Sequence, residues 1–149
     1  MRSLDGWVID ANVANKWYLR DEDLLAQADA IRNAVQDRSV LGVCPHVARH
    51  EVANTMAVAY RGGRISRERA VASLASFLAT GLSNDGDADW LVSEAAEIAM
   101  ELPVFINDAV YIALADRLGV QCVTADRKLY NAVTHRFPFV RWLGDIPVP

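Results

Sequence analysis

The sequence has little that would cross-link, anchor or export the chain. Only two of its 149 residues are cysteines, and Cys44 and Cys122 lie in short apolar runs without a CxxC spacing. Two buried, reduced thiols are therefore expected instead of a disulfide or a zinc site. The longest apolar runs are too short to cross a bilayer, and residues 1–6 lack the apolar stretch of a secretory signal. We expect a cytoplasmic protein without a membrane anchor.

A strong positive charge is also missing. The net charge of −4 and the pI near 5.3 are not typical of nucleic-acid-binding proteins, which are usually basic. Arginine is nevertheless concentrated in one region, where residues 49–69 contain Arg49, Arg61, Arg64, Arg67 and Arg69. This cluster is compatible with phosphate contacts and equally with the ordinary solvated surface of a helix pair.

Two familiar catalytic patterns are incomplete. His46 and His50 have the spacing of the HExxH zinc motif, but Val47 stands where the glutamate base is required, which excludes that chemistry. The run that ends in Asp10 opens like the aspartyl phosphotransferases of the haloacid-dehalogenase type. Those enzymes need a second aspartate at the position of Asn12, so this alternative is disfavoured.

The patterns that are present predict an α/β domain. A composition of 52% hydrophobic and 23% charged residues predicts one globular domain over residues 1–149, with a sizeable core. Strand-like runs at residues 7–9, 40–44, 121–124 and 139–143 alternate with helical patterns at residues 11–19, 23–36, 46–61, 70–80, 90–102 and 108–118. Residues 83–89 are rich in turn formers. The order predicts three layers, with helices flanking a mainly parallel sheet.

Helix ends are marked by the residue types that favour them. Ser66 and Asn107 are predicted N-caps, and the helices are expected to end at Gly62-Gly63, near Gly81 and at Gly119.

Four acidic residues stand where such a core favours apolar or small side chains: Asp10, Glu51, Asp108 and Asp126. Asp10 and Asp126 follow strand-like runs, and the carboxyl ends of parallel strands are where open α/β sheets keep their sites. Carboxylates gathered at one edge repel one another, so their expected purpose is to hold a hard divalent cation.

Each acid also has a purely structural interpretation. Asp10 and Asp126 suit helix caps or turns, and Asp108 suits the first turn of a helix, where the macrodipole favours an anion. Glu51 shares with Asn54 a helix face that looks directed to the core, and it could instead pair with Arg49 or Arg61 at the helix edge.

Taken together, the motifs resemble those of PIN domains, specifically the VapC-type toxins of bacterial toxin–antitoxin pairs. The resemblance spans nearly the whole chain and rests on ordered blocks at residues 8–13 (VIDANV), 50–54 (HEVAN), 107–115 (NDAVYIALA) and 123–129 (VTADRKL), with a turn at 62–65 (GGRI). It implies a metal-dependent endoribonuclease of dimeric form, silenced by a small VapB-like antitoxin.

The resemblance also implies roles for individual residues. The family's acids match Asp10, Glu51, Asp108 and Asp126, and its polar companion matches Thr124. We expect Asp10, Glu51 and Asp108 to provide most of the ligation of Mg²⁺ or Mn²⁺, and Asp126 with Thr124 to position a second ion or the attacking water.

Five further residues are given supporting roles in this interpretation. Asn12 and Asn54 are expected to orient the carboxylates, and contacts to RNA phosphates are expected from Arg61, Arg64 and Arg67. The main alternative is a PIN-like interaction module without catalysis, and the intact set of acids argues against it.

Overall fold

The computed structural model describes residues 5–83 and 89–149 of the chain. Its elements in chain order are β1 (Gly6–Ile9), α1 (Ala11–Ala14), η1 (Asn15–Trp17), α2 (Leu25–Gln36), β2 (Leu41–Val43), α3 (Val47–Arg61), α4 (Arg67–Ala79), α5 (Asp89–Glu101), α6 (Ile106–Leu118), β3 (Gln121–Thr124), α7 (Arg127–Val133), β4 (Val140–Trp142) and η2 (Leu143–Asp145), where η marks a 3₁₀ helix.

The four strands form one sheet in the order β2-β1-β3-β4, and every neighbouring pair is parallel. The chain passes from β1 to β2 on one side and returns to place β3 on the other side of β1. The order of the strands therefore reverses beside β1, and the carboxyl edge between β1 and β3 is the kind of position where open α/β sheets bind ligands. The predicted α/β architecture with a parallel sheet is confirmed.

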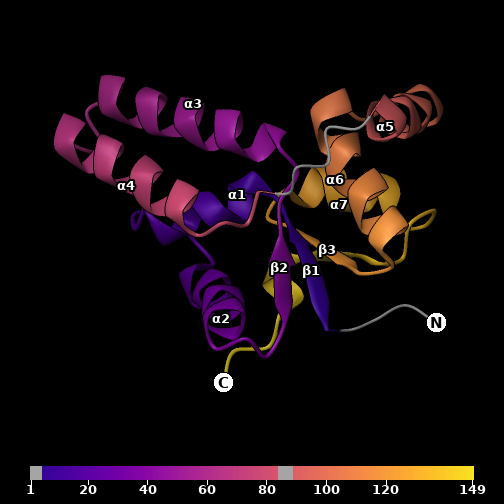
Figure 1. The fold of residues 1–149 in the computed structure, drawn as a ribbon, viewed down its shortest axis with the longest axis horizontal. Coiled ribbons are helices and arrows are strands. Elements are labelled where there is room, and N and C mark those ends of the chain that lie inside the picture. The colour runs from indigo at the N-terminus through magenta and orange to yellow at the C-terminus, as the bar shows by residue number, and fades with distance from the viewer. Residues whose placement is uncertain (1–4, 84–88) are drawn as a thin grey trace.

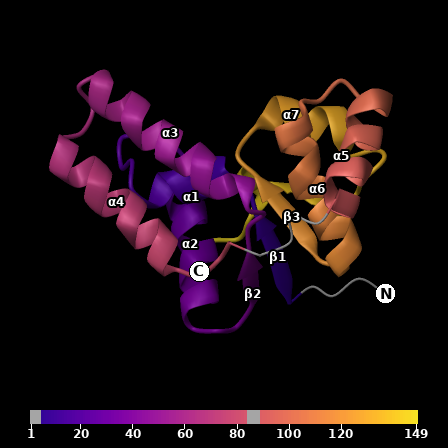
Figure 2. The same cartoon turned by 45° about the horizontal axis from the view of Figure 1, so that its top comes forward.

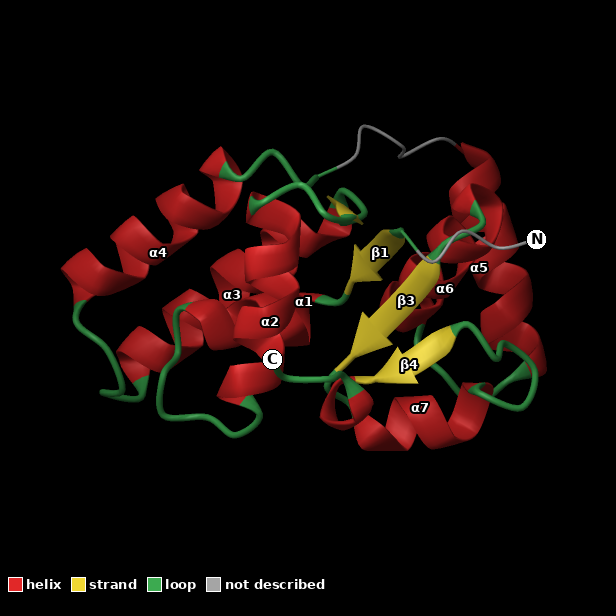
Figure 3. Cartoon of the chain, turned by 90° about the horizontal axis from the view of Figure 1, so that it is seen from below, coloured by secondary structure: helices red, strands yellow, loops and turns green. Residues whose placement is uncertain are grey.

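Helices cover both faces of the sheet. Helices α5 and α6 lie on one side, and α1 to α4 lie on the other, as the two views in Figures 1 and 2 show. Figure 3 shows the sheet from below, with β1, β3 and β4 pointing toward α1. The carboxyl ends of β1 and β3 thus meet the helices of the second group.

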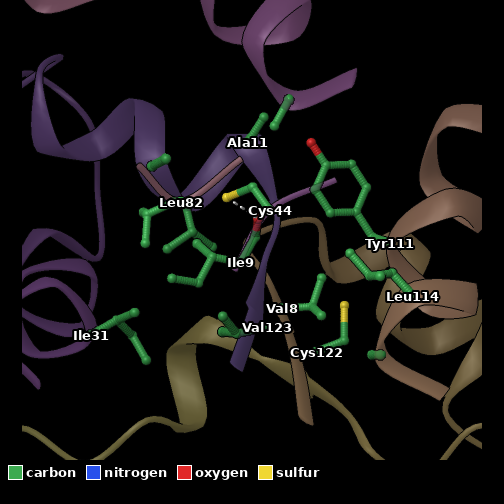
Figure 4. Packing of buried hydrophobic residues seen from close by; sticks show 14 of the residues in the cluster. Val8, Ile9, Ala11, Ile31, Cys44, Leu82, Tyr111, Leu114, Cys122 and Val123 are labelled. Carbon is green, nitrogen blue, oxygen red and sulfur yellow. Dashed lines mark hydrogen bonds between the residues drawn. The ribbon is translucent and has the colours of Figure 1, made fainter. Parts of the chain in front are cut away.

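Side chains that alternate along β1 fill the two halves of the core. Val8 and Cys122 are partners in register and lie on the side of Leu114, whereas Ile9 lies on the side of Leu82 (Figure 4). Val8 and Ile9 are fully buried. Both cysteines are free and buried, as predicted, and the Cys44 thiol donates to the carbonyl of Ile9 at 3.2 Å.

The predicted helix signals are confirmed at several ends. The Ser66 side chain caps α4 by accepting from the backbone N–H of Arg69 at 3.1 Å. Gly63, Gly81 and Gly119 all have positive φ, which lets the chain leave a helix through the left-handed region.

Other expectations need correction. The helix predicted for residues 11–19 is a four-residue α-helix that tightens into a 3₁₀ turn, and α6 begins at Ile106 with Phe105 as its N-cap, so Asn107 is not a cap. The strand at residues 40–44 is not buried throughout, because β2 is an edge strand and Leu41 is 66% exposed. Most of the turn-rich segment 83–89 lies outside the described residues.

Within the described ranges, no single helix is long and apolar enough to span a membrane. Helices α5 and α6 meet the criteria of length and composition only as a pair, which is bent by 117°.

Candidate functional site

Two of the predicted acids follow adjacent strands at the carboxyl edge of the sheet. Asp10 comes directly after β1 and Asp126 follows β3, and the backbone N–H of Asp10 donates to the carbonyl of Val123 at 3.0 Å. Both are also helix N-caps: Asp10 caps α1, and Asp126 accepts from the N–H of Leu129 at 3.0 Å to cap α7. The structural interpretation of these two residues is therefore correct, and it leaves a functional role open.

Asp10 is the most buried acid of the group, with 5% of its surface exposed. Burial raises the pKa of its carboxyl group to about 7, an effect that the hydrogen bond from Thr124 partly offsets and the charges of Glu51 and Asp108 reinforce. The Thr124 hydroxyl donates to Oδ2 at 2.9 Å, and the N–H of Asn12 approaches Oδ1 at 3.4 Å. Few donors therefore compensate the buried charge.

Thr124 links Asp10 to the start of α7. Its hydroxyl oxygen accepts from the Asn12 side-chain amide at 3.3 Å and from the N–H of Asp126 at 3.1 Å, while the hydroxyl proton goes to Asp10. The Asn12 carbonyl oxygen in turn accepts from the N–H of Ala125 at 2.9 Å. Asn12 thus orients Thr124 and holds the turn between β3 and α7. Its expected role in orienting the carboxylates stays a prediction.

Glu51 reaches the same group of acids from α3. Its Oε1 accepts from the Tyr111 hydroxyl at 2.6 Å, and Tyr111 is buried in α6 with its phenol oxygen at the end nearer α1 (Figure 4). Burial raises the pKa of Glu51; the bond from Tyr111 acts in the opposite sense, and the charge of Asp108 adds to the rise. The alternative pairing of Glu51 with Arg49 or Arg61 is not found among the described residues.

Tyr111 is a site residue that the sequence interpretation missed. The available signal was its spacing, because Tyr111 follows Asp108 by three residues and so lies on the same side of α6. A tyrosine in an apolar helix is more simply interpreted as core, and it is indeed 1% exposed. Only the tertiary structure shows that the Tyr111 hydroxyl donates a hydrogen bond to the Glu51 carboxylate.

Asp108 connects the two halves of the acidic group. It lies in the first turn of α6, as predicted, and is half-buried. Burial raises its pKa, and the nearby charge of Asp126 raises it further. Through these mutual interactions Asp10, Glu51, Asp108 and Asp126 form one electrostatically coupled set, which we call the acidic group.

Asn54 does not belong to this set. The buried stripe of α3 is formed by Ala48, Val52, Met56 and Ala59, and at 100° per residue Asn54 falls about 200° from Val52. Asn54 is accordingly exposed. The expectation that Asn54 orients a carboxylate is not supported, because Asn54 itself is turned to solvent whereas Glu51 is half-buried.

The predicted phosphate-binding arginines lie away from the acidic group. Arg61 ends α3 and Arg67 begins α4, at the tip of a hairpin that projects from the sheet (Figures 1 and 2). Ten residues separate Arg61 from Glu51, which is about 15 Å along a helix. Arg64 is engaged by Asp21 at 2.7 Å and Glu22 at 3.1 Å. A direct role at the site is therefore not supported for Arg64, and for the other two it stays a prediction.

The acidic group suits a hard divalent cation by its donor chemistry. Its side chains provide carboxylate oxygens only. Burial, and to a smaller extent their mutual charges, make the ionised forms of Asp10, Glu51 and Asp108 unfavourable without a counter-charge. In residues 5–83 and 89–149 no three acidic, histidine or cysteine side chains already stand at metal-binding distances. The fit to Mg²⁺ or Mn²⁺ therefore rests on the type of donor and not on a preformed set of ligand distances.

Comparison with known proteins identifies the family. A search of the curated proteins gives no significant match. Among solved structures, the chain is similar to the crystal structure of PAE2754 from Pyrobaculum aerophilum, with 24% sequence identity and a TM-score of 0.58, over 85% of this chain and 78% of that one. This likeness concerns the fold. The family model of the PIN domain matches residues 7–133, so the chain belongs to the PIN-domain family.

Proposed function

We propose that this protein is a Mg²⁺- or Mn²⁺-dependent endoribonuclease and that it acts as the toxin of a VapBC-like toxin–antitoxin pair. PIN domains are commonly nucleases that use divalent metals, which supports the coarser part of this proposal. The observation that carries it is the acidic group: four coupled carboxylates, one of them buried with its pKa raised to about 7, at the reversal point of a parallel sheet.

The proposed roles of the site residues are based on their mutual charges and on their hydrogen bonds. Asp10, Glu51 and Asp108 would hold the cation, because these three interact with one another through their charges. When bound, a divalent cation supplies positive charge to the scissile phosphate and makes a water molecule more acidic. Thr124 keeps one oxygen of Asp10 fixed, and Tyr111 does the same for Glu51. Asp126, more exposed and adjacent to Asp108, is placed to orient a water or a second ion.

The test is cleavage of a fluorogenic single-stranded RNA with Mn²⁺, with and without chelator. Asp108→Asn should abolish metal-dependent cleavage. Glu97→Gln is the matched control, since Glu97 is an exposed acid on the neighbouring helix α5. Equal cleavage by both variants would reject the acidic group as the catalytic centre. Metal binding without cleavage of any RNA would favour the alternative of an interaction module.

The proposed partners follow from the toxin assignment. A VapB-like antitoxin would cover the acidic group and place a basic side chain among its carboxylates, where charge complementarity is strongest. A homodimer is proposed on the same basis. Co-expression with the product of the adjacent gene should yield a complex in which RNA cleavage is suppressed, and light scattering of the isolated protein should give the mass of a dimer.

A further inference from the structure

A cavity of about 250 Å³ lies directly beside the acidic group, between the start of α6 and helix α7. Its apolar lining includes Leu129 and Ala132, and Leu129 is 7% exposed. Asp108 and Asp126 line it on the side of the acidic group. Pockets for whole small molecules span roughly 300–1,000 Å³, so this smaller cavity suits one part of a longer ligand.

Phe105 stands at the edge of this cavity and is 82% exposed. Among the described aromatic residues, the only other one with a largely exposed side chain is Tyr60, at 44%. The backbone of Phe105 is fixed because it caps α6 and its carbonyl accepts from the N–H of Ala109 at 3.0 Å. An apolar ring is thus held in solvent three residues before Asp108, where it could offer its face to a flat ligand.

Lys128 provides a positive charge in the same cavity. It is exposed and makes no ion pair with another described residue. Its cationic neighbours are engaged: Arg127 lies over the ring of Trp142 at 4.1 Å, and Arg136 pairs with Glu101 at 2.8 Å. The Lys128 ammonium group is therefore available to an anionic ligand next to a site that is otherwise acidic.

A flat aromatic face, an available ammonium group and a neighbouring site for phosphodiester chemistry match the parts of one nucleotide in a single strand. A base in a duplex is covered on both faces by its neighbours, whereas an unpaired base can stack on an aromatic side chain. We propose that the cavity between α6 and α7 is a subsite for an unpaired RNA nucleotide next to the scissile bond, with its base on Phe105 and its phosphate on Lys128. The inference rests on the proposed nuclease function and assigns Phe105 and Lys128 as residues that contact the substrate.

The test measures binding independently of cleavage. Short single-stranded RNAs carrying one 2-aminopurine are titrated with protein in chelator, where stacking quenches the fluorescence of the base. Quenching is expected with the unmodified protein and with Phe105→Tyr. Phe105→Ala should weaken binding roughly 5- to 150-fold, the range expected for one stacked base. Phe105→Leu should lose the quenching although it keeps an apolar side chain.

Three controls separate stacking on Phe105 from binding elsewhere on the protein surface. Tyr60→Ala removes the other exposed aromatic ring and should leave quenching unchanged. Lys128→Ala should weaken binding and reduce its dependence on salt, which Lys128→Arg should restore. A duplex RNA of the same sequence should show no quenching that depends on Phe105.

The outcomes distinguish the subsite from the nuclease proposal. Quenching that depends on Phe105, in a protein that cleaves no RNA, would support binding of an unpaired nucleotide in the cavity and would reject the nuclease and the placement of this nucleotide beside a scissile bond. Normal cleavage with binding that Phe105→Ala leaves unchanged would reject the subsite alone. If Phe105→Ala changed only the oligomeric state measured by light scattering, the cavity would be a protein interface and the subsite would be rejected.

Discussion

At the scale of single residues, the central feature is a carboxylate kept in a place that disfavours its charge. Asp10 is almost fully buried and has only a weak set of donors, dominated by the Thr124 hydroxyl. Such an arrangement lowers stability in the absence of a counter-charge and is characteristic of residues retained for function. The same carboxylate should therefore dominate the pH dependence of both stability and metal binding.

Replacing Asp10 by asparagine should stabilise the metal-free protein at alkaline pH. A folded-state pKa of about 7 against an ordinary value of 3.8 means that the native carboxyl group is unfavourable when ionised. The penalty is fully present above pH 7, shrinks as the pH falls and vanishes below about pH 4. At 1.36 kcal/mol for each pKa unit, the gain at pH 8 is at most about 4 kcal/mol. Urea unfolding at pH 8 and pH 5 measures it.

The control for this prediction is Asp145→Asn, which changes an exposed aspartate in η2. It should alter the free energy of unfolding by less than about 0.5 kcal/mol at either pH. Destabilisation of Asp10→Asn at pH 8 would show that the folded protein prefers the ionised carboxyl group, contrary to the raised pKa of Asp10.

Tyr111→Phe should change the behaviour of Glu51 without removing a carboxylate. The tyrosine hydroxyl lowers the pKa of Glu51, so its loss should raise that pKa further and move the acidic limb of the pH–activity profile to higher pH. A cost of about 1 kcal/mol in stability is expected for the lost hydrogen bond. Tyr130→Phe, on α7, is the matched control. An unchanged pH–activity profile would show that Tyr111 does not influence activity through Glu51.

At the scale of elements, the strands and most helices could be predicted from the sequence. The strand at Gln121–Thr124 was predicted with its observed bounds, because a short apolar run preceded by Gly119 has few alternatives. Helix α7 was not predicted, since seven residues that include Arg127 and Lys128 give a weak periodic signal. Its existence depends on the Asp126 cap and on packing of Leu129 and Val133 into the core.

The site was predictable only in part, because some of its contacts depend on tertiary packing and not on a local sequence pattern. An acid that directly follows a strand-like apolar run can be recognised in the sequence, and this pattern identified Asp10 and Asp126. The contact between Tyr111 and Glu51 joins two helices that are 60 residues apart in the sequence, and no local pattern encodes it. The exposure of Asn54 depends on which side of α3 packs against the core. Apolar residues occur on more than one side of this helix, so the sequence pattern alone does not determine the buried side.

Helix α7 offers a way to separate the structural role of Asp126 from a chemical one. Asp126→Asn keeps an oxygen that can cap α7 and removes the charge, whereas Asp126→Ala removes both. We expect the alanine variant to lose about 1 kcal/mol of stability and the asparagine variant to stay near wild type. Both should lose most of the RNA cleavage. Retained cleavage in Asp126→Asn would limit this residue to its capping role.

At the scale of the whole molecule, the fold gathers four carboxylates from distant parts of the chain at one edge of a parallel sheet. Two come from the ends of β1 and β3, and two come from helices on opposite sides of the sheet, α3 and α6. The free energy of folding thus brings together groups that repel one another. A divalent cation is the component that would convert this repulsion into stabilisation.

Mg²⁺ or Mn²⁺ should therefore raise the thermal stability of the protein. Saturation to 100 times the dissociation constant corresponds to about 2.7 kcal/mol. The increase should be larger at pH 8 than at pH 6, because protonation of Asp10 below pH 7 competes with the cation. Differential scanning fluorimetry with metal and with chelator measures it. If the metal raised the thermal stability of Asp10→Asn by the same amount, the cation would bind at a site other than the acidic group.

The most direct test of the central claim is incubation of the purified, partner-free protein with total cellular RNA and Mg²⁺ or Mn²⁺. Parallel reactions contain chelator or the Asp10→Asn variant. A metal-dependent endoribonuclease centred on the acidic group predicts discrete fragments that disappear in both parallel reactions. Fragments that persist in chelator, or that Asp10→Asn produces equally well, would contradict the account.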